Sequence, residues 1–269
     1  MKNSFLKQNC DIFINSFKRI NLKIFLILFF DILFYFIFMQ AGNFFMNAMQ
    51  KRATNVDLTQ NFMNLNQQVA NTLLTSVRGF FSFLIISLIL FAVLMIINWS
   101  LFKGLNWAIT ANKKFNLKFF KKFLQLNLIW LPIWFLLIFL FAIIIKPTAA
   151  PIYMVIILII AFYLTNILYP LFLKHTETQY VSGAKKSKAF LGNSKIKTIK
   201  EAFKLGIKKI HHFIMPYLII IIFFLIISKL YKLITLNIDA NPNIFFGIIL
   251  IFIAWMRYYF VEIVESLSK

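Results

Sequence analysis

The chain has 269 residues, of which 61% are hydrophobic and only 14% are charged. Water-soluble domains are nearer half apolar and a quarter charged, so this composition excludes an ordinary soluble protein and predicts an integral membrane protein. Lysine and arginine outnumber aspartate and glutamate by 29 to 8, a net charge of +21. The basic residues lie in short runs beside apolar stretches, which favours contact with anionic lipid over binding to nucleic acid.

The first segment, residues 1–23, is basic and amphipathic. Its basic residues lie off a stripe of apolar residues that recur at spacings of three and four, as in a helix lying on the membrane surface. No small-x-small cleavage site closes the apolar run that follows, so we expect this segment to be retained. The stripe consists of Leu6, Cys10, Phe13, Phe17, Ile20 and Ile24.

Six apolar stretches are long enough to cross the roughly 30 Å hydrocarbon core at about 1.5 Å per helical residue. The breaks within the second and third pairs are short, so each of these pairs must run antiparallel. The sequence therefore predicts an all-α integral membrane protein, a single transmembrane domain over residues 1–269. We expect three antiparallel hairpins, each preceded by a basic amphipathic cytoplasmic surface helix. The predicted spans are 24–41, 80–102, 123–145, 151–173, 213–236 and 244–264.

Residues 42–79, between the first two spans, are polar and rich in asparagine and glutamine. Apolar residues recur at helical spacing from Phe62 to Val77, and Asp57 is a candidate N-cap. We expect one long helix from about 57 to 103 that projects beyond the bilayer and forms an outer hairpin with the extended first helix. The alternative is a helix that lies flat on the outer surface.

Two further segments, residues 103–122 and 174–212, are basic. In the second, a helix predicted over 194–210 places lysines mostly opposite an apolar face. The triplets Lys18-Arg19-Ile20, Lys121-Lys122-Phe123 and Lys208-Lys209-Ile210 each precede an odd-numbered span, which indicates a threefold repeat. The predicted contacts with anionic lipid are Lys18, Arg19, Lys121, Lys122, Lys197, Lys200, Lys204, Lys208 and Lys209.

The distribution of basic residues predicts the orientation. The N-terminal segment, the two basic segments and the C-terminus together hold 22 lysines and arginines, whereas the opposite loops hold 4. By the positive-inside rule, both termini are cytoplasmic in a multi-pass protein of the cell membrane.

No catalytic or metal motif emerges from the sequence. His211 and His212 are adjacent, so they diverge on a helix and lack further ligands at zinc spacing; we expect no metal and no cofactor. The chain has no Gly-rich phosphate loop, no HExxH and no Ser/His/Asp set. We therefore do not expect an enzyme, although an intramembrane lipid-processing enzyme remains a third alternative.

Five polar residues share one depth within the predicted spans, roughly 6–10 Å below the cytoplasmic interface. They suggest a polar layer or a cavity open to the cytoplasm, and the alternative is a set of interhelical hydrogen bonds without a substrate. These residues are Asp31, Asn98, Asn127, Asn166 and Arg257.

Two of these residues, Asp31 and Arg257, are predicted to form an ion pair, with Asn98 or Asn166 adding contacts. In the alternative, Arg257 reaches to the interface, helped by Glu262 or Glu265, and Asp31 is protonated. We expect the two glutamates themselves to be solvated.

Two functional classes follow. In the first, the protein is transporter-like or binds a lipid or small solute through the polar layer. In the second, it is a non-catalytic scaffold or complex subunit. Its basic cytoplasmic face would then hold anionic lipid or an acidic partner, and its outer hairpin, residues 42–79, would contact another protein.

Overall fold

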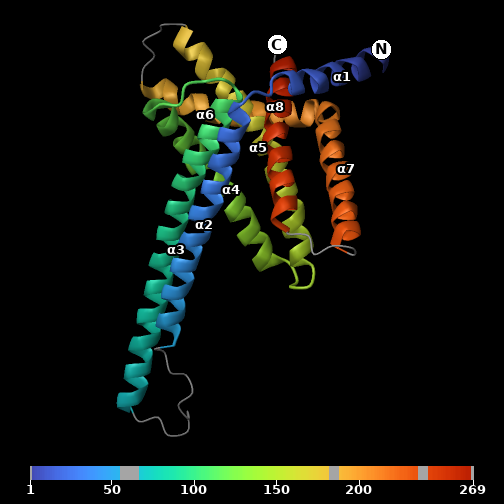
Figure 1. The fold of residues 1–269 in the computed structure, drawn as a ribbon. Coiled ribbons are helices and arrows are strands. Elements are labelled where there is room, and N and C mark those ends of the chain that lie inside the picture. The colour runs from blue at the N-terminus through green and yellow to red at the C-terminus, as the bar shows by residue number, and fades with distance from the viewer. Residues whose placement is uncertain (1, 55–66, 182–187, 236–241, 268–269) are drawn as a thin grey trace.

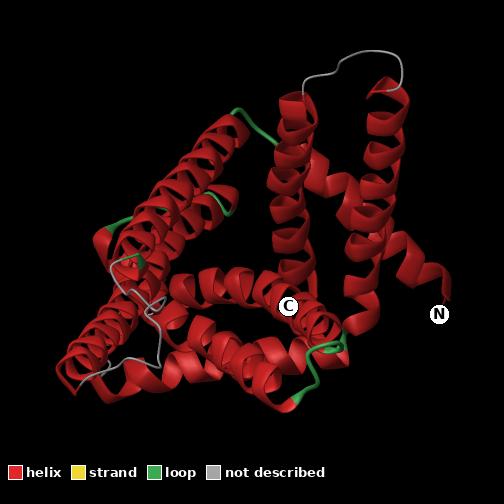
Figure 2. Cartoon of the chain, turned by 90° about the horizontal axis from the view of Figure 1, so that it is seen from below, coloured by secondary structure: helices red, strands yellow, loops and turns green. Residues whose placement is uncertain are grey.

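The computed structural model describes residues 2–54, 67–181, 188–235 and 242–267, and within these ranges it contains eight helices and no strand (Figure 2). Six of the helices are long and apolar enough to cross a membrane. The predicted all-α class with six apolar membrane helices is confirmed. The helices are α1 (Lys2–Lys18), α2 (Lys23–Ala53), α3 (Gln67–Thr110), α4 (Leu117–Ile144), α5 (Ala150–Val181), α6 (Lys188–Lys208), α7 (Ile210–Thr235) and α8 (Pro242–Leu267).

Two ends of the molecule differ in what they carry (Figure 1). The terminal end holds α1, α6 and both chain termini, and the loop end holds the opposite ends of the paired long helices. Each long helix contains one predicted apolar stretch, or nearly all of it, and continues beyond it at one or both ends. α3 runs through Gly79 without a break and ends at Thr110, beyond the expected end near residue 103.

α2 and α3 pack along each other and extend past the other long helices at the loop end (Figure 1). The extension includes the described parts of the predicted outer hairpin, residues 42–54 and 67–79, most of which are helical. The remainder of that prediction, including the Asp57 cap, falls outside the described residues.

Short helices run across the terminal end (Figure 1). α1 packs against α8, where the Trp255 indole N–H donates to the Ser16 hydroxyl over 3.2 Å. Residues 103–122 do not form a third surface helix, because they are divided between the end of α3, a short loop and the start of α4. α6 begins at Lys188 rather than near residue 194.

α8 is the central helix, in contact with α1, α2, α3, α5 and α7. In its most apolar window 61% of the residues are buried, against 6% for α3. The buried side chains come mainly from the terminal half of each long helix, and the largest of them include Phe123, Trp130, Tyr169 and Phe213. The loop-end halves expose most of their apolar side chains.

Two glycines allow close approach within this packed half. A Cβ at Gly104 would lie 3.0 Å from the ring of Phe123, and one at Gly206 would lie 3.1 Å from Leu164. The absence of GxxxG predicts packing through large side chains. At each of these two positions, a single glycine leaves room for a large side chain from another helix.

Candidate functional site

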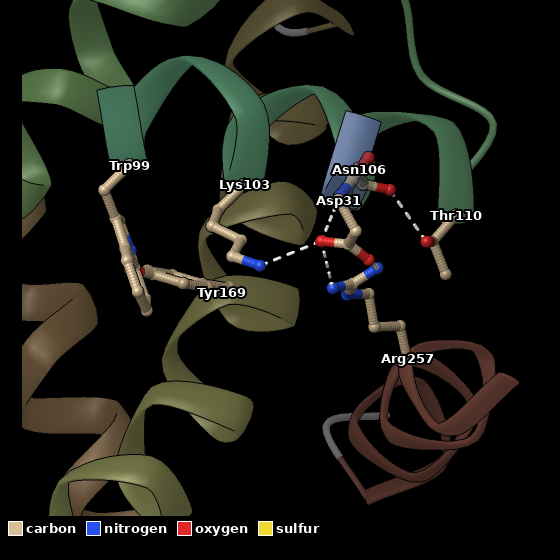
Figure 3. Close-up of polar contacts among 7 residues, drawn as sticks. All are labelled: Asp31, Trp99, Lys103, Asn106, Thr110, Tyr169 and Arg257. Atoms are coloured by element: carbon tan, nitrogen blue, oxygen red, sulfur yellow. Dashed lines mark hydrogen bonds and ion pairs between the residues drawn. The ribbon is translucent and has the colours of Figure 1, made fainter. Parts of the chain in front are cut away.

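The buried carboxylate of Asp31 is the centre of the candidate site, and Arg257 is its main partner (Figure 3). Arg257 donates from both terminal guanidinium nitrogens, to Oδ2 over 2.7 Å and to Oδ1 over 2.9 Å. Only 1% of Asp31 and 7% of Arg257 are exposed. The predicted ion pair is therefore present in the structure, in the two-pronged geometry that is strongest for arginine and carboxylate.

α3 contributes two further donors, which sequence reasoning missed (Figure 3). The Lys103 ammonium lies 2.8 Å from Oδ1 of Asp31, and the Asn106 amide nitrogen donates to the same oxygen over 2.9 Å. Neither Asn98 nor Asn166 is among the hydrogen-bond partners of Asp31, so that part of the prediction is wrong. We name Asp31, Lys103, Asn106 and Arg257 the charged cluster.

Aromatic rings surround the ammonium of Lys103. Its nitrogen lies 4.6 Å from the ring centroid of Phe34, 5.5 Å from that of Tyr35 and 5.6 Å from that of Trp99. The negative faces of such rings attract a cation. Lys103 is only 9% exposed, so it does not belong to the solvated basic segment in which the sequence placed it. The number of basic residues that supports the predicted orientation therefore falls by one.

A second polar set joins α3, α4 and α5. The Trp99 indole N–H donates to the Tyr169 hydroxyl over 2.8 Å, and this hydroxyl donates to Oδ1 of Asn127 over 2.8 Å. The amide nitrogen of Asn127 donates in turn to the Ser100 hydroxyl over 3.0 Å. These hydrogen bonds pair the polar groups of four buried or half-buried side chains with one another. None of the four side chains carries a charge.

The other two asparagines of the predicted layer lie apart. Asn166 donates to the Tyr217 hydroxyl over 3.4 Å. Asn98 is buried, and its amide nitrogen has no hydrogen-bond partner within the described part of the chain. The structure thus brings Asp31 and Arg257 together and distributes the three asparagines among separate contacts.

Arg19, between α1 and α2, forms an ion pair with both glutamates at the end of α8. Its Nε lies 2.7 Å from Glu262 and its Nη2 lies 2.7 Å from Glu265. Partial burial alone would lower the pKa of Arg19, but the hydrogen bond and charge of Glu265, with the charge of Glu262, raise it. The expectation that both glutamates are solvated is wrong for Glu262, whose side chain is 17% exposed, whereas that of Glu265 is 44% exposed. Both glutamates tie the connection between α1 and α2 to α8.

The other predicted lipid-contacting lysines lie at the terminal end and are exposed, except Lys122, which is half-buried. On α6 the lysines Lys197, Lys200, Lys204 and Lys208 flank an exposed apolar row, whereas the helix buries a third face. The buried face consists of Thr198, Ile199, Ala202 and Gly206, and the exposed apolar row of Ile196, Phe203 and Ile207.

The histidines form no metal site in the structure. The rings of His211 and His212 contact each other, with centroids 4.4 Å apart. Across the described ranges, no group of three or more histidine, cysteine, aspartate or glutamate side chains is arranged to hold a metal ion.

Comparison with protein families, curated proteins and solved structures finds no match to this chain. The functional argument therefore rests on the geometry above.

Proposed function

We propose that this polytopic membrane protein is non-catalytic and binds an anionic ligand, a lipid headgroup or a small solute, at the charged cluster. The observation that carries the proposal is the charge balance: Lys103 and Arg257 face a single carboxylate, Asp31. An unbalanced charge within a membrane costs about 2.5–3.5 kcal/mol on insertion scales. A bound anion would remove that cost.

The position of Lys103 supports a role beyond holding helices together. Asp31 and Arg257 alone already join α2 to α8 with balanced charge. Lys103 adds the surplus cation, and its aromatic neighbours hold the ammonium beside the pair. Asp31 is eight residues from the start of α2, which is about 12 Å along a helix, so the cluster lies near the terminal end.

The test removes only the surplus charge. Wild-type protein purified in mild detergent should retain an anionic lipid or solute, counted and identified by native mass spectrometry. Lys103→Met should lose it while keeping the balanced Asp31–Arg257 pair, whereas the control Lys51→Met, at an exposed site on α2, should retain it. Equal retention by Lys103→Met and wild type, or no bound anion in either, would refute the proposal.

We also propose that the terminal end faces the cytoplasm of a cell membrane. The excess of basic residues at this end supports the orientation. In a background lacking Cys10, a cysteine at Lys204 should be protected from an impermeant thiol reagent in intact cells, and a cysteine at Lys51 should react. The reverse pattern would overturn the orientation.

A second candidate function is a scaffold or complex subunit, and the observation that favours it is the extension of α2 and α3 past the other helices. Toward its far end, a shallow hollow is lined by Asn47, Gln50, Lys51 and Thr54. A stoichiometric second protein in the purified complex, lost when alanines replace Asn47, Gln50 and Lys51, would support this function. A complex unchanged by these substitutions would refute it.

A further inference from the structure

The start of α4 aligns polar side chains along one face. Asn116 caps the helix, because its side-chain oxygen accepts from the Phe119 N–H over 2.8 Å. Lys118, Lys122 and Gln125 follow at spacings of four and three, so they lie above one another on the same face.

α6 brings a third lysine to this face. The ammonium of Lys195 donates to the side-chain oxygen of Gln125. Farther along, Phe203 of α6 contacts Trp130 of α4, with ring centroids 5.8 Å apart. These two contacts place Lys195 beside the polar row of α4.

The three lysines act on one another electrostatically. Partial burial lowers the pKa of Lys122, and the charges of Lys118 and Lys195 lower it further. Lys195 is half-buried, and this burial lowers its pKa. Bringing like charges together is unfavourable, and a multivalent anion between them would turn repulsion into attraction.

We infer that Lys118, Lys122 and Lys195 form a binding site for a phosphate group, that of an anionic lipid headgroup. The site is separate from the charged cluster and does not depend on the function proposed for it. Of its three lysines, only Lys122 is among the contacts predicted from the sequence. The ammonium groups of the three lysines come from two helices, and phosphate oxygens accept several N–H donors at once.

The surface beside the lysines identifies the source of the phosphate. Along the same face of α4, the polar row continues into Ile129 and Ile133, which are 38% and 39% exposed. Ile196, next to Lys195, is 48% exposed. A headgroup bound by the lysines would therefore lay its acyl chains along an apolar track, which free phosphate could not use.

The test compares two triple variants of the full chain with equal charge loss. Lys118→Gln, Lys122→Gln and Lys195→Gln together remove the site, whereas Lys146→Gln, Lys229→Gln and Lys232→Gln remove three exposed lysines at the loop end. Each protein in neutral detergent is titrated with phosphatidylglycerol, and bound lipid is counted by native mass spectrometry. Circular dichroism confirms that both variants keep wild-type helix content.

The first variant should bind the lipid at least about tenfold more weakly, since a lysine near an anionic membrane is worth about fivefold. The control should change by less than about threefold. Equal weakening in both variants would assign the effect to diffuse charge and overturn the site. If millimolar inorganic phosphate displaces the lipid completely, or if binding is unaffected by acyl-chain removal, the lipid assignment is wrong.

Loss at this site can be told apart from loss at the charged cluster. The lysine variant should leave the ligand that depends on Lys103 in place, and Lys103→Met should leave the lipid bound here. An experiment that refutes one of the two proposals therefore leaves the other unaffected.

Discussion

The terminal and loop-end halves of the long helices are made of similar residues and yet pack very differently. In the terminal half of α4, Phe123 is fully buried among Phe119, Tyr169 and Phe172. In the loop-end half of the same helix, Phe139 is 63% exposed. Both are phenylalanines within one continuous apolar stretch.

Polar side chains account for the difference. The charged cluster and the hydrogen bonds that link Trp99, Tyr169 and Asn127 both lie in the terminal half. Together they join α2, α3, α4, α5 and α8. Apolar side chains gain little by leaving lipid for protein, so hydrogen bonds and close packing decide which halves associate. The loop-end halves meet through ring contacts such as Phe223–Phe252 and Tyr231–Phe245 and present most of their apolar surface to lipid.

The largest effect is expected from removing the carboxylate of the charged cluster. Asp31→Asn leaves Lys103 and Arg257 as two buried cations without an anion, which should cost about 3–5 kcal/mol. Arg257→Gln leaves Asp31 balanced by Lys103 and should cost less. The fraction of monodisperse protein after heating in detergent, by size-exclusion chromatography, measures both.

This ranking also tests the charge count on which the proposed function rests. If Arg257→Gln is as damaging as Asp31→Asn, Lys103 does not carry a charge that balances Asp31. The cluster would then be a simple pair with no surplus cation.

The next effect compares the two phenylalanines of α4. Phe123→Ala leaves a cavity among three aromatic rings and should lower the free energy of unfolding by about 2 kcal/mol. This is less than the 3–5 kcal/mol of water-soluble cores because lipid removes most of the transfer contribution. Phe139→Ala should change it by less than about 0.5 kcal/mol. Steric trapping in bicelles measures both, and equal losses would show that the two halves pack alike.

The fold was largely predictable because span length is a strong signal, as the placement of all six long helices shows. The Asp31–Arg257 pair followed from two opposite charges at one depth. Lys103 and Asn106 were missed because the second span was ended at residue 102, where the first lysine interrupts it. Their spacing with Thr110, at three and four residues, is the signal that α3 continues as a packed helix.

Other features had no signal in the sequence. Nothing in the sequence distinguishes Phe123 from Phe139, because both are phenylalanines in the same apolar stretch and contribute equally to its hydropathy. The contacts of Arg19 with Glu262 and Glu265 join residues about 245 positions apart. Such pairing depends on which helices become neighbours, and periodicity within one helix does not encode that.

A comparable effect is expected at Gly104, against which the ring of Phe123 packs. The Cβ of Gly104→Ala would lie 3.0 Å from the Phe123 ring and 3.3 Å from that of Phe115. This overpacking should cost about 1–3 kcal/mol. Gly247→Ala, on α8, meets nothing within 4 Å and should be neutral or slightly stabilising through helix propensity. Thermal unfolding in detergent tests the pair, and a stabilising Gly104→Ala would refute the close approach.

The smallest effect separates the uncharged polar set from the charged cluster. Tyr169→Phe removes the hydroxyl that accepts from Trp99 and donates to Asn127. Hydrogen bonds between membrane helices average about 0.6 kcal/mol and reach about 1.7 kcal/mol. Since two are lost and two buried groups are left unpaired, we expect about 1–2 kcal/mol. Tyr153→Phe, on the same helix but 43% exposed, should cost almost nothing. Equal effects in unfolding measurements would mean that the Tyr169 hydroxyl does not hold α3, α4 and α5 together, and that the charged cluster alone distinguishes the packed half.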